Sequence, residues 1–163
     1  MSEADAFIGL LDPAMYVVTA AAGGERAGCL VGFGSQCSIR PVRFVVWLSK
    51  ANRTFRVAER ADHLAVHLLT RDQHTLAELF GGRTGDDGLD KFAHVRWTER
   101  PEGALVLQDA PAWFVGRVVL RTDAGDHVGF VLDPVAAGRR EGAKGPLLRL
   151  ADALGISPGH PAG

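Results

Sequence analysis

Gly28 to Lys50 reads GCLVGFGSQCSIRPVRFVVWLSK, two apolar runs around a polar, glycine-rich passage. The first run, Cys29 to Phe33, predicts a strand. The last, Val42 to Leu48, is rich in β-branched and aromatic residues, as expected of a strand buried on both faces. The small residues between the runs would let a flat ligand approach the backbone, and free N–H and hydroxyl groups could bond its edge. An equally good interpretation is a hairpin-like corner whose glycines only relieve a tight bend.

Length and composition narrow the class of protein. A chain of 163 residues, 47% of them hydrophobic, predicts a single domain with a sizeable core. The net charge of −1 argues against a nucleic-acid partner, which would need a basic surface. No apolar run approaches the roughly 20 residues that span a bilayer, and the acidic N-terminus lacks a signal-peptide pattern. We therefore expect a cytoplasmic protein with no membrane partner.

The two cysteines and the histidines do not predict a metal site. Cys29 and Cys37 lie on or beside one strand, which favours reduced core thiols over a bridge or a metal pair. No histidine has zinc-ligand spacing to a cysteine or glutamate.

Hydrophobic patterns along the chain predict many strands and three short helices. Strands are predicted over Met15 to Ala21, His63 to Leu69, Phe92 to Trp97, Ala104 to Leu107, Trp113 to Arg121 and His127 to Val135. Helices are predicted before Asp12-Pro13, over Ala51 to Arg60, and after a capping box at Thr70 to Gln73. The fold class is therefore mainly β. A closed or nearly closed β-barrel with short flanking helices is favoured over a layered α/β fold.

The character of the chain changes near Ala137. Gly138 to Gly145 predicts a flexible linker, and Pro146 to Leu154 predicts one or two helical turns. We divide the chain into a barrel domain, residues 1–136, and a linker and C-terminal tail, residues 137–163. A solvated tail is favoured over an arm that packs on a partner subunit.

Motifs for covalent catalysis and phosphate loops are missing from the sequence. Ser35 and Ser38 have no neighbouring histidine and aspartate to activate a nucleophile. The start of a dinucleotide fingerprint at Gly32 is not followed by a long helix. His127, in Gly125-Asp126-His127, has the most suggestive setting of the histidines, a tight turn that enters a strand. Its alternative is a turn residue whose ring bonds the backbone.

Taken together, the motifs from about Leu10 to Val135 resemble the flavin reductase-like, FMN-binding split-barrel family. These proteins are small reductase components that pass reduced flavin to monooxygenases. The motifs that carry the resemblance are GCLVGFGSQCS from Gly28, Pro41 with its following strand, KANRT from Lys50, LAELF from Leu76, DKF from Asp90, and GDH from Gly125. Leu30, Gly32 and Phe33 stand where the family has threonine and serines, so backbone N–H groups and nearby polar side chains would make those contacts.

The resemblance implies an NAD(P)H-dependent flavin reductase that transfers hydride from NADH or NADPH to FMN, or to FAD. It also implies a homodimer with flavin at the subunit interface, and a flavin-dependent monooxygenase as partner. His127 would be the catalytic residue, beside the flavin face on which nicotinamide stacks. The cofactor-binding residues would be Leu30, Val31, Gly32, Phe33, Ser35, Gln36, Cys37, Ser38, Lys50, Ala51, Asn52, Thr54 and Phe92. The alternative is a split-barrel protein that binds flavin, or another cofactor, without catalysis.

The residue types also suggest where a flavin phosphate would bind. Asn52 and Thr54 lie at a predicted helix start with Lys50 and Arg53 close by. Backbone dipoles, a hydroxyl and a cation at such a place would form an anion site. An ordinary helix cap is the simpler interpretation, and the two roles are compatible.

Overall fold

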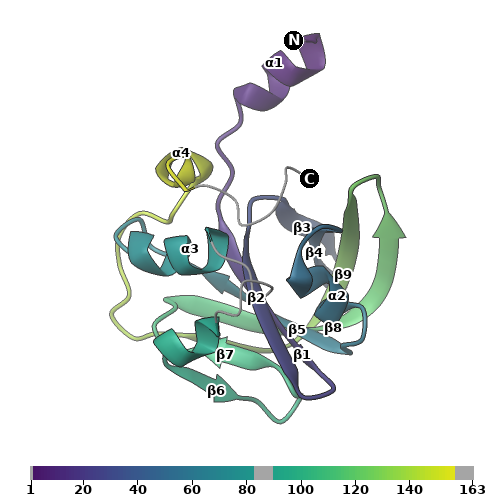
Figure 1. Ribbon diagram of the computed structural model, residues 1–163, viewed down its shortest axis with the longest axis vertical. Helices are drawn as coiled ribbons and strands as arrows, with labels where there is room; N and C mark the ends of the chain where they lie inside the picture. The colour runs from purple at the N-terminus through teal and green to yellow at the C-terminus, as the bar shows by residue number, and fades with distance from the viewer. Residues whose placement is uncertain (1, 83–89, 157–163) are drawn as a thin grey trace.

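A computed structural model describes residues 2–82 and 90–156 (Figure 1). Within these residues, antiparallel strands form one sheet in the order β2-β1-β5-β8-β9-β4-β3. Its strands are β1 (Tyr16–Ala22), β2 (Glu25–Val31), β3 (Gly34–Ile39), β4 (Val42–Ser49), β5 (His63–Leu68), β8 (Ala112–Asp123) and β9 (His127–Arg139). A separate hairpin joins β6 (Trp97–Glu99) and β7 (Leu105–Leu107). The predicted mainly β architecture with short helices is confirmed, although the sheet has β2 and β3 as open edges.

The strand β1 separates two apolar clusters because its side chains alternate between the faces of the sheet. Val18 and Ala20 pack with residues of β2, β4 and β9 and with the helix α2 (Arg53–Ala58). Val17 packs on the opposite face with residues of α3 (His74–Gly81) and β7. Val17, Val18 and Ala20 are fully buried, and burial of a valine side chain contributes roughly 1.5–3 kcal/mol. β1 therefore fixes α2 on one side of the sheet and α3 on the other.

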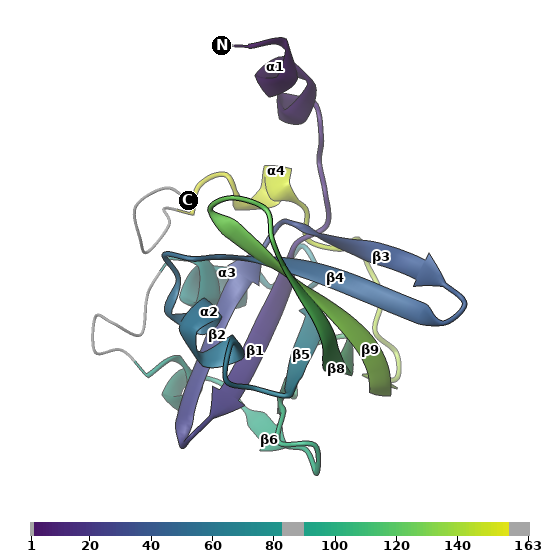
Figure 2. The same ribbon diagram turned by 90° about the vertical axis from the view of Figure 1, so that its right-hand side faces the viewer.

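Two predicted elements differ from the structure. The polar passage after Phe33 is the edge strand β3, paired with β4 and projecting with it from the body of the molecule (Figure 2). The predicted strand Phe92 to Trp97 is wrong. The chain there forms the 3-10 helix η2 (Lys91–His94), because the Asp90 carboxylate accepts a hydrogen bond from the Phe92 N–H at 3.1 Å. An Asx cap of this kind favours a turn over an extended strand.

The predicted capping box before α3 is half formed. The side-chain oxygen of Gln73 accepts a hydrogen bond from the Thr70 N–H at 2.9 Å. The helix itself begins only at His74, so Thr70 is not its N-cap.

The C-terminal segment packs on the barrel, so the interpretation of a solvated tail is wrong for it. β9 runs to Arg139, beyond the predicted strand end, and a short helix, α4, spans Leu150–Ala153. Leu148 is fully buried. Its N–H donates to Leu69 O at 2.9 Å, and its carbonyl accepts from the Met15 N–H at 3.0 Å. The division of the chain at residue 136 stays a prediction. The sequence also predicts a mobile loop over residues 83–88 and a frayed end over residues 157–163, and both stretches lie outside the described residues.

The N-terminal helix α1 (Glu3–Gly9) stands away from the barrel (Figures 1 and 2). Ser2 and Asp5 form a capping box at its start. None of its residues is buried, and Phe7, Ile8, Leu10 and Leu11 are exposed. The predicted helix is confirmed, but its apolar side chains do not belong to the core of this chain. In residues 2–82 and 90–156, no helix has the length and apolarity needed to cross a membrane.

Candidate functional site

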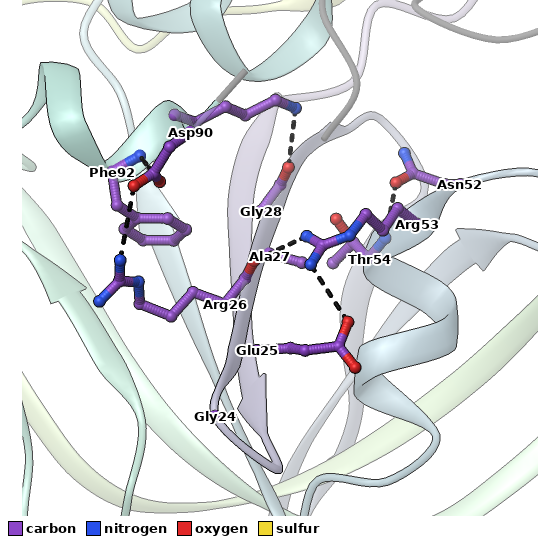
Figure 3. Close-up of a pocket in the computed structure, with 11 residues that line it drawn as sticks. Gly24, Glu25, Arg26, Ala27, Gly28, Asn52, Arg53, Thr54, Asp90 and Phe92 are labelled. Carbon is purple, nitrogen blue, oxygen red and sulfur yellow. Dashed lines mark hydrogen bonds and ion pairs between the residues drawn. The ribbon is translucent and has the colours of Figure 1, made fainter. Parts of the chain in front are cut away.

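A pocket of about 320 Å³ lies between the start of β2, the start of α2 and η2 (Figure 3). Figure 3 shows Asn52 and Thr54 on one side of it and Asp90 and Phe92 on the other, with β2 between them. The residues that line it are Gly24, Glu25, Arg26, Ala27, Gly28, Asn52, Arg53, Thr54, Asp90, Lys91 and Phe92. Three residues predicted to bind the cofactor, from segments almost 40 positions apart (92 − 54 = 38), therefore meet in one place.

The start of α2 is capped as the sequence predicts. Asn52 has extended backbone angles, and its Oδ1 accepts a hydrogen bond from the Thr54 N–H at 2.9 Å. Thr54 is 1% exposed. Because α2 has only six residues, its dipole is short, and the charge of the pocket comes mainly from side chains.

Lys91 is the deepest cation at this pocket. Its Nζ donates to Gly28 O at 3.0 Å and to Phe80 O at 3.1 Å, and it lies 5.6 Å from the centroid of the Phe80 ring. Burial lowers the pKa of Lys91. An ammonium can donate three hydrogen bonds, so among the described residues these carbonyls leave one donor for a ligand.

Two arginines form the outer part of the pocket. Arg53 Nη1 donates to Arg26 O at 2.7 Å, and Arg53 Nη2 pairs with Glu25 at 3.2 Å. Arg26 Nη2 pairs with Asp90 at 3.4 Å. The lining thus carries three cationic and two acidic side chains. This excess of positive charge suits an anion such as a phosphate.

The pocket offers no reactive nucleophile of its own. Cys29 lies beneath it, fully buried beside Thr54, and burial raises the pKa of this thiol to about 11. A cysteine reacts as its thiolate, so Cys29 stays an inert thiol at neutral pH. The prediction of a reduced core thiol is confirmed for Cys29, whereas Cys37 is a free thiol at the surface. The lining of the pocket is therefore suited to holding a ligand and not to nucleophilic catalysis.

A second cluster forms where β4 ends and β9 begins. His127 is the first residue of β9, where the sequence placed it, and its Nδ1 lies 2.7 Å from Asp126 Oδ1. The ring of the exposed Phe33 lies 4.9 Å from the His127 ring, centroid to centroid. The Lys50 N–H donates to Asp126 O at 2.9 Å, and Lys50 Nζ pairs with Asp123 at 2.8 Å. The turn before His127 is thereby tied to the end of β4.

A carboxylate can only accept hydrogen bonds, so Nδ1 of His127 carries the proton that Asp126 accepts. In the neutral ring, Nε2 is then a hydrogen-bond acceptor, and it donates only when the ring is protonated.

The other predicted site residues lie outside these two places. Leu30 and Val31 pack into the apolar clusters. Gly32 follows β2, where an added Cβ would lie 3.1 Å from the Met15 sulfur. The remaining residues are at the surface or half-buried: Ser35, Gln36, Cys37 and Ser38 on β3, and Ala51 before α2. Within one chain, the predicted residues do not form a single pocket.

Of the three cationic residues that line the pocket, sequence reasoning missed Arg26 and Lys91. Arg26 lies on an ordinary-looking strand, and nothing in its local sequence marks it. Lys91 did carry a signal, because it precedes Phe92 in the DKF motif from Asp90, one of the motifs that carry the family resemblance.

Comparison with known proteins gives the family. The model of the family described as "Flavin reductase like domain" matches residues 10–154. The chain belongs to this family. Solved structures share its split-barrel fold: the NADH:FAD oxidoreductase SgcE6 of Streptomyces globisporus C-1027 has a TM-score of 0.78 at 22% identity, over 90% of this chain and 86% of that one.

Curated relatives of the flavin reductase family match most of this chain. The FMN reductase (NADH) RutF of Methylorubrum extorquens is 32% identical over 117 residues, 72% of this chain. The stachydrine N-demethylase reductase subunit Stc3 of Rhizobium meliloti is 28% identical over 141 residues, 84% of this chain. The matched regions span 56% and 58% of the lengths of those proteins.

Proposed function

We propose that this protein is an NAD(P)H-dependent flavin reductase that transfers hydride from reduced nicotinamide to FMN or FAD. The observation that carries the proposal is the cation-lined pocket, in a chain of the flavin reductase family, where Asn52, Thr54 and Phe92 meet. The relatives named FMN reductase (NADH) and NADH:FAD oxidoreductase support the choice of flavin and nicotinamide. The bound flavin would supply the redox chemistry, which no side chain of this pocket offers.

The pocket would hold the phosphate end of the flavin. Thr54, Lys91 and Arg53 all line it, and they would offer the phosphate a hydroxyl, the third ammonium donor and a guanidinium. Charge-assisted hydrogen bonds from such groups are roughly twice as strong as neutral ones. The chain therefore fits the phosphate with residues that are already held in place: Lys91 by two carbonyls and Arg53 by Arg26 O.

His127 would orient the nicotinamide. Asp126 fixes the proton on Nδ1, which leaves Nε2 of the neutral ring to accept a hydrogen bond from the nicotinamide amide. Phe33 packs on the imidazole and presents an exposed apolar ring beside it. One such hydrogen bond is worth roughly 1–2 kcal/mol in positioning the hydride donor.

Stopped-flow kinetics of a histidine variant tests this role. His127→Ala should keep the fold and bind FMN, while flavin reduction by NADH or NADPH slows about tenfold to thirtyfold. His94→Ala, at an exposed position of η2, is the matched control and should react at the wild-type rate. If His127→Ala lowers the melting temperature but not the rate per folded molecule, His127 is only structural. A wild-type protein that binds flavin but oxidises neither nicotinamide would be a binding protein without catalysis.

We also propose a cytoplasmic homodimer in which the second subunit completes the flavin site. Support comes from the exposed apolar residues Phe7, Ile8, Leu10 and Leu11 on and after α1, since apolar surface of this kind marks contact sites. Trp47, Trp97 and Trp113 do not add support for a dimer interface, because each is half-buried within the chain. Light scattering at working concentration should give the mass of a dimer, and a monomer mass would contradict this proposal.

The last part of the proposal is a flavin-dependent monooxygenase as partner. It rests on the resemblance to reductase components and on a relative named as a reductase subunit. A partner that uses free reduced flavin would need no lasting complex with the reductase. Coupled turnover should therefore persist when a dialysis membrane separates the two proteins.

A further inference from the structure

Arg26 lies at the rim of the pocket as one layer of a stack. Its guanidinium carbon lies 5.0 Å from the centroid of the Trp97 ring and 6.0 Å from that of Phe92. The Trp97 Nε1–H donates to Phe92 O at 3.2 Å, which holds the indole in place. Asp90 pairs with Arg26 Nη2 at 3.4 Å. The guanidinium plane is thus held by aromatic rings and a carboxylate, while 42% of its side chain stays exposed.

A held, half-exposed guanidinium plane is a surface on which a flat base can stack. Arginine is planar and weakly hydrated, and it stacks on aromatic faces as lysine does not. Nucleobases stack on aromatic rings and on guanidinium planes whatever the identity of the base. The half-exposed Arg26 side chain therefore offers a plane on which a purine could stack as the next layer.

The size of the pocket argues that part of any dinucleotide lies outside it. Its volume of about 320 Å³ is at the lower end of the ≈ 300–1,000 Å³ range of ligand sites. It can enclose the phosphate region of a nucleotide but not a whole dinucleotide. Arg53 Nη1 bonds the backbone oxygen of Arg26 at 2.7 Å, so the stack begins where the phosphate-binding cations end. A chain of two phosphates in the pocket would lead its base out toward Arg26.

We propose that the Trp97-Arg26 stack binds the adenine of a dinucleotide whose diphosphate occupies the neighbouring pocket. The inference rests on the proposed function, because FAD and NAD(P)H both carry this adenosine diphosphate end. Arg26 is a specificity-determining residue that favours dinucleotides over FMN.

Calorimetric titration with ADP and with pyrophosphate tests the stack directly, without turnover. Wild type binds ADP more tightly than pyrophosphate. Arg26→Ala weakens ADP about tenfold, as expected for loss of one stacked base. Arg26→Lys keeps the charge but not the plane, so it weakens ADP severalfold and leaves pyrophosphate unchanged.

The chain supplies a matched control, because Arg100 lies 5.3 Å from the centroid of the Trp113 ring and pairs with Glu102 at 3.4 Å. Arg100, Glu102 and Trp113 do not line the pocket. Arg100→Ala removes an arginine from a comparable stack and leaves the ADP affinity at the wild-type value.

Two further titrations identify the dinucleotide. If the source is FAD, Arg26→Ala weakens FAD about tenfold and FMN less than twofold. If the source is the nicotinamide dinucleotide, Arg26→Ala instead raises the KM for NADH with riboflavin as acceptor, because riboflavin has no phosphate and leaves the pocket to the NADH diphosphate. The proposal is overturned if wild type binds ADP no more tightly than pyrophosphate, or if Arg26→Lys binds ADP as well as wild type. Because ADP binding needs no flavin reduction, an enzyme without reductase activity but with the Arg26 effect would refute the proposed function alone.

Discussion

Acid should weaken the fold through one buried histidine, His67. The ring is fully buried on β5, where its Nδ1–H donates to Val17 O at 2.9 Å and its Nε2 accepts from the Leu107 N–H at 3.0 Å. A second proton would place an N–H against the Leu107 N–H and a charge in an apolar interior. Burial accordingly lowers the pKa of His67 from 6.5 to about 4.

The size of the effect follows from this difference in pKa. Because the folded pKa is the lower one, only the unfolded chain takes up the proton between about pH 6.5 and pH 4. The stabilisation from neutral His67 is present above about pH 6.5 and is lost as the pH falls toward 4. Linkage gives a loss of about 2 kcal/mol by about pH 5 and about 3 kcal/mol by about pH 4.

Urea unfolding at a series of pH values, followed by tryptophan fluorescence, measures the loss. Wild type should lose about 2 kcal/mol of unfolding free energy between about pH 7 and pH 5. His67→Asn should be less stable at neutral pH but should lack most of this dependence. His94→Asn, at an exposed histidine, should keep the wild-type slope. If His67→Asn and wild type have the same slope, the reasoning is refuted.

Three further changes probe the pocket. Thr54→Val combined with Asn52→Ala should weaken FMN about tenfold more than riboflavin, and equal losses in a fluorescence titration would place the phosphate elsewhere. Glu25→Gln removes a carboxylate that competes with the phosphate for a guanidinium, so FMN should bind about threefold more tightly; weaker binding would contradict this competition. Gly28→Ala would place a Cβ 2.6 Å from a ring carbon of Phe80, so urea unfolding should show a loss of roughly 1–3 kcal/mol, and unchanged stability would mean that the ring moves freely.

Much of the fold could be predicted because its strands carry strong local patterns. The runs that became β1, β5, β8 and β9 are largely apolar, and β1, β8 and β9 are rich in β-branched residues. β3 was not predicted, because an edge strand with mostly exposed side chains has no apolar alternation to mark it. The sequence favours a tail for the C-terminal segment because Leu148, which anchors it, comes just after a stretch rich in glycine and charge.

The site was only partly predictable for a different reason. Asn52 and Thr54 carry a local signal, a polar cap before a helix, and the structure has that cap. Arg26 and Lys91 reach the pocket from segments 65 positions apart (91 − 26 = 65), and only the fold brings them together. The charge of the pocket is therefore a tertiary property. The Asp126 contact that fixes the His127 proton on Nδ1 likewise depends on side-chain geometry, which the sequence does not reveal.

The most direct test of the central claim is steady-state oxidation of NADH and NADPH by the purified wild-type protein with FMN and with FAD. We expect nicotinamide oxidation that is saturable in flavin and proportional to protein concentration. We also expect a lower KM for FMN than for riboflavin, because the pocket binds the phosphate. A protein that binds FMN tightly yet oxidises neither nicotinamide with either flavin would contradict the proposed reductase function.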